Sequence, residues 1–320
     1  MKEFQINERD SGQRLDKYLK KYLKEASTGF LYKMLRKKNI KLNGKKAEGK
    51  ELLQPGDVVT LYLSDETIER FRGNASQKQY AVTDLDIIYE DEDVLIMNKP
   101  VGMLSQPTGK QDTTIVEYML GYLQSEKKWS PEESFTPGVC NRLDRNTSGI
   151  VLAGKSLHGA QELSAMLRER TLKKYYLTVV EGVVFEPSYV KGYLVKDEKT
   201  NKVTIYKDER NQGDRIETQY EPLINNGQYT LLRVKLITGK THQIRAHLSS
   251  QGHPIVGDVK YGGRKVCGLT NQLLHAYEIQ FPESHGVLGH LSNRWFRATL
   301  PPEFKRIQKQ MGLTMQGGKK

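Results

Sequence analysis

The pattern of apolar residues changes near residues 65–80, and this change limits the possible folds more than any other feature of the sequence. Before it, apolar side chains recur at helical spacing over 15–23 and 30–36. A strand then enters a turn at Asn43-Gly44, and the turn in "PGDVVTLYL" is followed by a strand over 58–63. After it, short apolar runs bounded by glycine and polar residues dominate, which is typical of strands. The sequence therefore predicts a small helix–helix–strand unit followed by a larger, strand-rich one.

We predict a first domain over 1–64, a linker over 65–80, a second domain over 81–306 and a C-terminal tail over 307–320. The linker is predicted because its residues show no sustained periodicity and include Gly, Asn, Ser and Gln. In the second domain, helices do not alternate regularly with strands, which excludes a doubly wound parallel sheet. We expect an α+β fold with a large mixed, mainly antiparallel sheet flanked by helices and loops.

The positive charge is concentrated in the N-terminal unit. The net charge is +12, and residues 14–50 contain 13 basic and 3 acidic side chains. Such a local excess attracts polyanions, and phosphate backbones are the commonest of them, although a basic face can also serve solubility alone. We favour nucleic-acid binding over the solvated face. The predicted contact residues are Lys17, Lys33, Arg36, Lys37, Lys38 and Lys41.

The sequence shows no secretory signal segment, no membrane-spanning run and no cysteine pattern typical of disulfides or metal sites. The N-terminus has no apolar signal segment, and no apolar run approaches the length that spans a bilayer. Two cysteines, Cys140 and Cys267, provide neither a disulfide framework nor a cysteine-rich metal site. We expect a cytoplasmic protein that does not bind membranes and is a monomer.

Two short motifs suggest chemistry that their context does not support. Residues 149–156, "GIVLAGKS", match the phosphate-loop spacing, but the four spacer residues are those of a buried strand rather than a flexible turn. A nucleotide-hydrolysing enzyme is therefore a weak alternative. In "THQIRAH", His242 and His247 are five residues apart, so on a helix they point in different directions, and no nearby residue completes a metal site. We predict no metal.

Several longer stretches, taken in order, carry a resemblance to a known family. "NRLDRNTSG" (141–149) resembles the H-R-L-D-x-x-T-S-G signature of the RluA-type RNA pseudouridine synthases. The other matching stretches are "NKPVGMLSQP", "KKYYLTVVEG", "LITGKTHQIRAHLSSQGHPIVGDVKYG", "LLHAYEIQF" and "FRATLPPEF". Together they cover roughly residues 86–304. Asn141 departs from the signature, since the family usually has His there. The N-terminal unit resembles the alpha-L RNA-binding domain of the ribosomal protein S-four type.

The resemblance implies an isomerase that converts uridine to pseudouridine in structured RNA. It implies the pseudouridine synthase catalytic fold and a reaction without redox change, so no cofactor is expected. The expected partner is large-subunit ribosomal RNA or an assembling ribosomal subunit, because the alpha-L-like unit suits a bulky structured substrate. A transfer RNA substrate and a non-catalytic, RNA-binding ribosome-assembly factor remain as alternatives.

The resemblance also assigns residues to the chemistry. Asp144 would be the catalytic carboxylate, acting on carbon 1′ as a nucleophile or on the 2′ proton as a base. Arg245 would keep it ionised, although it could instead pair with another acid. Tyr176 would lie against the uracil, or else be a core residue of its strand, with Tyr175 on the opposite face. Arg142 would contact RNA where the target base leaves its stack. His242 and Gln243 are further predicted RNA contacts.

Overall fold

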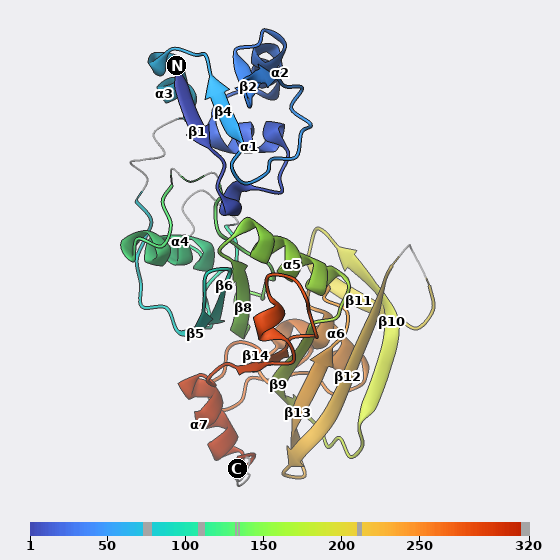
Figure 1. Ribbon diagram of the computed structural model, residues 1–320. Helices are drawn as coiled ribbons and strands as arrows, with labels where there is room; N and C mark the ends of the chain where they lie inside the picture. The colour runs from blue at the N-terminus through green and yellow to red at the C-terminus, as the bar shows by residue number, and fades with distance from the viewer. Residues whose placement is uncertain (73–78, 108–112, 132, 134, 210–212, 315–320) are drawn as a thin grey trace.

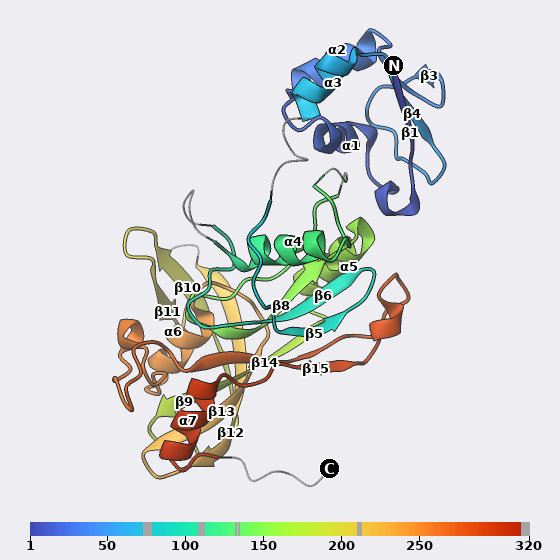
Figure 2. The same cartoon turned by 90° about the vertical axis from the view of Figure 1, so that its left-hand side faces the viewer.

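The computed structural model describes residues 1–72, 79–107, 113–131, 133, 135–209 and 213–314, and these form a small N-terminal body joined to a larger one (Figures 1 and 2). Within this described part, the small body contains a four-stranded sheet and the large body an eleven-stranded sheet. Helices accompany both sheets without a regular strand–helix alternation. The predicted α+β class is confirmed.

In the described residues, the N-terminal body is an antiparallel sheet with three α-helices packed beside it. In the hairpin between the second and third strands, Asn43 and Gly44 both have positive φ, 51° and 72°, as a two-residue turn of type I′ requires. The helices predicted over 15–23 and 30–36 are present, and the predicted last strand begins at Val58. The elements are β1 (Lys2–Gln5), α1 (Leu15–Tyr22), α2 (Thr28–Arg36), β2 (Ile40–Leu42), β3 (Lys45–Lys46), β4 (Val58–Leu61) and α3 (Asp65–Arg72).

The predicted linker begins within α3, so its first part is not a linker. Ile68 is 2% exposed and belongs to the apolar core of the N-terminal body, and Phe71 packs against that core. A single buried apolar turn is too short to show helical periodicity in the sequence, which is why the pattern missed it. Residues 73–78 lie outside the described residues, so the domain boundaries that follow stay a prediction.

The large sheet is mixed and mainly antiparallel, as predicted. Its main order is β11-β10-β12-β13-β9-β14-β8-β6-β5, with β15 paired to β14 and β7 to β8. Among these pairs only β14 and β8 run parallel. The strands are β5 (Ile87–Glu90), β6 (Val94–Lys99), β7 (Gly138–Val139), β8 (Ser148–Gly154), β9 (Lys173–Glu181), β10 (Ser188–Asp197), β11 (Lys202–Tyr206), β12 (Asp214–Asn225), β13 (Tyr229–Leu236), β14 (Leu274–Gln280) and β15 (Trp295–Arg297).

Four α-helices of the described residues accompany the large sheet. α5 packs against β8, and α6 packs against β11 and β12. No helix in the described ranges is long and apolar enough to cross a membrane. The helices are α4 (Ile115–Ser125), α5 (Leu157–Arg168), α6 (Gln243–Ser250) and α7 (Pro302–Gln310).

The predicted C-terminal tail is wrong for its first residues. α7 continues past residue 306, and Ile307 and Leu313 are fully buried in a core cluster that also holds Phe304. The final residues of the predicted tail, 315–320, lie outside the described ones.

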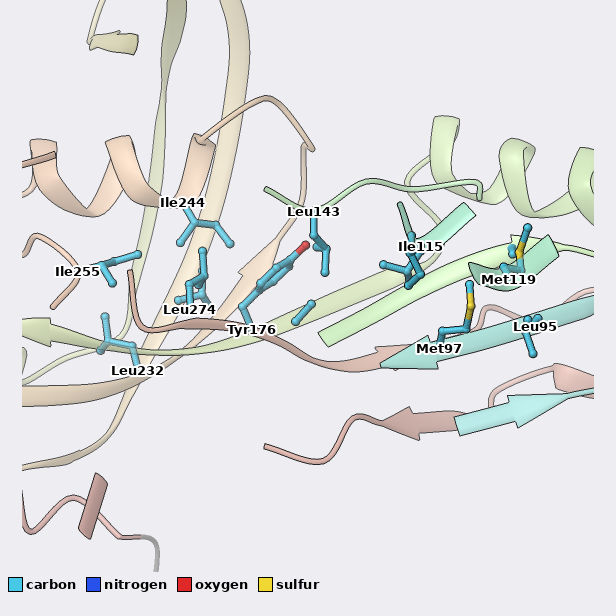
Figure 3. Close-up of a cluster of buried hydrophobic side chains, with 14 of the residues drawn as sticks. Leu95, Met97, Ile115, Met119, Leu143, Tyr176, Leu232, Ile244, Ile255 and Leu274 are labelled. Carbon is cyan, nitrogen blue, oxygen red and sulfur yellow. The ribbon is translucent and has the colours of Figure 1, made fainter. Parts of the chain in front are cut away.

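The parallel pairing of β8 with β14, near the middle of the large sheet, determines where the candidate site lies. Gly149 on β8 has φ 110°, and a Cβ there would lie 2.2 Å from the carbonyl oxygen of Ala276 on β14. Only glycine permits this approach. Since β14 also pairs with β9, the loop before β8 and the start of β9 lie on neighbouring parts of the sheet. In Figure 3, Tyr176 of β9 lies beside Leu143 of that loop.

Candidate active site

Asp144 lies in the loop between β7 and β8, and that loop is pinned by hydrogen bonds. The Ser105 hydroxyl accepts from the backbone N–H of Leu143 at 3.0 Å and donates to the Leu143 carbonyl at 2.9 Å. The N–H of Thr147 donates to the carbonyl of Asp144 at 3.0 Å. Leu143 is buried, whereas the Asp144 side chain remains 26% exposed. The carboxylate is therefore held in place with one face open.

Asn141, the position that departs from the family signature, anchors the same loop. Its side-chain oxygen accepts from the N–H of Leu152 at 2.7 Å, and its amide nitrogen donates to the carbonyl of Ile150 at 3.3 Å. Both partners belong to β8, so the amide ties the loop to the strand that follows it.

Replacing Asn141 with alanine is expected to destabilise the protein by about 1–3 kcal/mol, because two half-buried backbone groups lose their partner. Chemical denaturation measures this directly. Replacing exposed Asn225 with alanine provides a comparison in which one exposed side-chain bond is lost. Equal effects of the two substitutions would contradict the anchoring role.

Arg245 joins Asp144 to a second, buried carboxylate. Its Nη1 lies 3.0 Å from Asp144 Oδ2, while Nε and Nη2 donate to the two oxygens of Asp258 at 2.7 and 2.8 Å. Asp258 is 2% exposed. Such a two-pronged pair fixes the guanidinium plane as well as its position. The predicted partnership of Arg245 and Asp144 is present in the geometry, and Arg245 pairs with another acid at the same time.

Asp258 was not identified as a site residue from the sequence. The signal was present, since Asp258 is the acid of the G-D-x-x-Y-G ending that carried the resemblance. A spacing of 13 residues from Arg245 does not reveal a contact, because α6 and an irregular segment separate the two.

Lys99 is a second cation near Asp144 and was also missed. It is fully buried, and its Nζ donates to the carbonyls of Pro100, Met103 and Arg145 at 2.9, 2.8 and 3.1 Å. Burial lowers the pKa of Lys99 to about 8, and the negative charge of Asp144 opposes that shift. In the described chain Lys99 forms no ion pair of its own, so its charge acts on Asp144. In the sequence, Lys99 could have been identified as the lysine of the N-K-P stretch that carried the family resemblance.

His242 faces Asp144 from the start of α6. Its Nε2 lies 3.9 Å from Asp144 Oδ2, and its Nδ1 lies 2.9 Å from the hydroxyl of Tyr261. That hydroxyl accepts from the N–H of Val203 at 3.0 Å, so its own proton is free to point to Nδ1. Burial lowers the pKa of His242, while Asp144 opposes this. A neutral imidazole with its proton on Nε2, toward Asp144, fits these contacts.

Tyr176 forms an apolar wall beside Asp144. It is 7% exposed and packs in the cluster of Leu143, Ile244 and Leu274 shown in Figure 3, where its hydroxyl is directed toward Leu143. Burial, together with the charge of Asp144, raises the pKa of Tyr176. The phenol therefore keeps its proton at neutral pH. Tyr176 is thus a core residue that also lines the cleft, and its contact with a uracil stays a prediction.

These residues line a cleft of about 940 Å³ whose charge is strongly one-sided. Among the described side chains that line it, eight are basic and Asp144 is the one acid. The basic residues are Arg142, Arg145, Arg170, Lys174, Lys196, Lys240, Arg245 and Lys260. A cleft of this size and charge suits part of a polyanion rather than a small neutral molecule.

The other predicted RNA contacts differ in their exposure to solvent. Arg142 is exposed and lines the cleft. Gln243 is 2% exposed, and its amide makes four bonds inside the protein, so it has none left for RNA and holds its loop instead. This corrects the prediction for Gln243. The N-terminal cations Lys17, Lys33, Arg36, Lys37 and Lys38 are exposed, and Lys41 is half-buried.

The two doubtful motifs have structural roles. Residues 149–154 are part of β8, and Lys155 pairs with Glu90 at 2.7 Å, so this stretch is not a phosphate loop. The two histidines of "THQIRAH" make separate contacts, His242 with Tyr261 and His247 with Thr218 at 2.9 Å. Within the described residues, no group of three or more His, Cys, Asp or Glu side chains is arranged to hold a metal ion.

Comparisons with known proteins agree on one family. The sequence model described as RNA pseudouridylate synthase matches residues 93–250, and that of the S4 domain matches residues 13–59. Ribosomal large subunit pseudouridine synthase C of Vibrio parahaemolyticus is 33% identical, with 96% of this chain and 95% of that protein covered. An uncharacterized RNA pseudouridine synthase of Mycoplasma capricolum is also 33% identical, over 92% of this chain and 96% of that one.

A solved structure supports the same fold. Human RNA pseudouridylate synthase domain containing 4 superimposes with a TM-score of 0.59 at 21% identity, covering 72% of this chain and 94% of that one. The sequence identity over nearly the full chain, the family match and the shared fold lead to one conclusion: this chain is an isomerase that belongs to the RNA pseudouridine synthase family.

Proposed function

We propose that the protein converts uridines of large-subunit ribosomal RNA to pseudouridine, with Asp144 as the carboxylate that acts on the ribose. One observation carries the proposal: Asp144 is the single acid among the described side chains of a basic cleft, and it is paired with Arg245. Relatives whose names specify the ribosomal large subunit support the choice of RNA.

The reaction breaks the bond between N1 of uracil and carbon 1′ and forms a bond between carbon 5 and carbon 1′. The base must be detached and turned, and carbon 5 finally loses its proton, so the uridine and its product have the same atoms apart from that exchanged proton. An ionised carboxylate at the open face of the loop can attack carbon 1′ or take the 2′ proton, and both remain possible for Asp144. Arg245 keeps positive charge beside it, and Lys99 adds a second positive charge below about pH 8.

Tyr176 contributes a surface in this scheme. Because burial and the charge of Asp144 raise the pKa of Tyr176, its hydroxyl is a donor rather than a base at neutral pH. We infer that the ring supports the flat face of the uracil while the base turns. The proton of carbon 5 then leaves to solvent water, and N1 takes up a proton from water.

The target nucleotide must leave its stack to reach Asp144, since the carboxylate lies within the cleft. Arg142 is exposed at the cleft, and its side chain is suited to fill the space that the target base leaves in the stack or to bind a flanking phosphate. The exposed cations of α2 and the following turn are suited to RNA further away, in agreement with the S4 domain match. Arg142 and these cations remain proposed contacts.

Release of tritium from carbon-5-tritiated large-subunit ribosomal RNA tests the proposal. Release that depends on the protein would support it, and a comparison with tritiated transfer RNA separates the two substrate classes. RNA binding without release from either would favour a ribosome-assembly factor instead. Mapping pseudouridines in a strain that lacks the gene then identifies the site.

The rate of tritium release is expected to fall about tenfold as pH rises through about 8. Lys99 is charged below this pH and neutral above it, and a neutral amine has only two N–H donors for the three carbonyls that Lys99 holds, one of which belongs to Arg145 next to Asp144. A pH profile of the single-turnover rate measures this. The Lys99→Met variant should already be slow at pH 7 and show no fall near pH 8; an unchanged profile in that variant would contradict the role of Lys99.

A further inference from the structure

Three cations in the cleft have no partner among the residues that the structure describes. Five of the eight basic residues are engaged: Arg245, Lys196 and Lys240 pair with carboxylates, and Arg145 and Lys260 donate to carbonyl oxygens. The side chains of Arg142, Arg170 and Lys174 make neither a hydrogen bond nor an ion pair with any described residue. Positive charge that is gathered without a counter-ion marks a place for an anion from outside.

Lys174 is the most informative of the three because it is half-buried. Burial lowers the pKa of Lys174, and the nearby charge of Arg170 lowers it further. A partly desolvated ammonium beside a guanidinium is unfavourable in the free protein. An anion bound between the two would remove both costs.

The position of Lys174 relates it to Tyr176. The two residues are two apart on β9, so their side chains project from the same face of the strand, with Cα atoms about 6–7 Å apart. Both line the cleft. A nucleotide whose base lies on Tyr176 would therefore have its backbone within reach of Lys174.

Arg170 completes the group from the segment that leads into β9. It follows α5 with φ 60° and is exposed. The acid whose pKa it influences, Glu217, is itself held by Arg215 at 3.0 Å and by the hydroxyl of Tyr189. The guanidinium of Arg170 thus remains available.

We propose that Lys174 and Arg170 form a binding site for a backbone phosphate of the RNA, next to the nucleotide whose base lies on Tyr176. The inference rests on the proposed function, since it takes RNA as the ligand. A phosphate offers oxygens to both the ammonium and the guanidinium, and it is the group that recurs along an RNA strand whatever its sequence. The site fixes the position of the strand and leaves the choice of uridine to other contacts.

The salt dependence of catalysis tests this site. The experiment measures kcat/KM for tritium release from large-subunit ribosomal RNA at several potassium chloride concentrations. For the native protein log(kcat/KM) should fall linearly with log salt, and Lys174→Gln should make that slope shallower by about 0.7–0.9, the loss of one phosphate contact. At low salt Lys174→Gln should lower kcat/KM about tenfold, through an increase in KM. Lys174→Arg should keep the native slope.

Two further variants separate binding from folding. Arg170→Gly suits the left-handed backbone at that position, so its Tm should not fall, yet its slope should become shallower as with Lys174→Gln. Lys305→Gln removes the same charge from an exposed site on α7, and should leave slope and KM unchanged. Native slopes in both Lys174→Gln and Arg170→Gly would overturn the proposal, as would a loss confined to kcat.

The slope of log Kd against log salt is also measured for the same RNA, because equilibrium binding requires no turnover. Absence of tritium release by the native protein would reject the proposed function. Release by the native protein together with unaltered slopes in the variants would reject only the phosphate site.

Discussion

Replacing Asp144 with asparagine is expected to lower the rate of tritium release by about 10⁴-fold or more while leaving folding and RNA affinity unchanged. The amide has nearly the same shape, and its oxygen can still accept the bond from Arg245 Nη1, which spans 3.0 Å in the native protein. It has no negative charge with which to attack carbon 1′ or remove the 2′ proton. The measurement is the single-turnover rate at saturating enzyme, together with RNA affinity and Tm.

Asp214→Asn is the matched control for that experiment. Asp214 is an exposed carboxylate paired with Lys240, a residue of the same cleft, at 2.6 Å. The substitution removes an equal charge from a pair near the cleft but not from Asp144, so release should change by less than about twofold. If Asp144→Asn still released tritium at a rate close to that of the native protein, the assignment of the catalytic carboxylate would be wrong.

The sequence predicted the parts of the fold that local patterns encode. The helical stripe through Leu15 and Leu19 and the Asn43-Gly44 turn specify their conformations through nearby residues alone, and both are confirmed. The irregular order of helices and strands was enough to predict a mixed, mainly antiparallel sheet. These predictions needed no knowledge of distant contacts.

The predictions that failed depend on contacts that no local pattern records. α3 and the end of α7 are short, and each is ordered by a few apolar side chains, among them Ile68 and Ile307, that reach a distant core. Gln243 looked like a free polar residue beside His242, yet its amide is fully bonded inside the protein. Its partners are the hydroxyls of Thr218 and Thr238, the carbonyl of Glu217 and the N–H of Lys240. A polar side chain on one short helix gives no sign of which strand lies opposite.

The residues of the candidate site also divide into those that sequence motifs identified and those that only the structure revealed. Asp144, Tyr176 and Arg245 were chosen through ordered motifs, and the structure brings them to one cleft. Asp258 and Lys99 lie in the same motifs but were not chosen, since their importance arises from burial: one holds the guanidinium in place and the other is a cation without an acid of its own. Burial at these two positions follows from packing across the sheet and not from spacing along the chain.

Arg245→Met is expected to lower the free energy of unfolding by about 3–5 kcal/mol, because it leaves the buried carboxylate of Asp258 without its partner. It should also slow tritium release by about 10²–10³-fold, as expected when a fixed charge beside the reacting group is removed. Chemical denaturation and single-turnover kinetics measure the two losses separately.

The double variant Arg245→Met, Asp258→Asn distinguishes the two functions of the guanidinium. Asparagine at position 258 removes the buried charge that Arg245 no longer neutralises, so most of the lost stability should return. The rate should not return, because Asp144 still lacks the cation 3.0 Å from its Oδ2. Recovery of activity along with stability would mean that Arg245 serves only to hold the fold together, and that other cations such as Lys99 and Lys260 supply the positive charge beside Asp144.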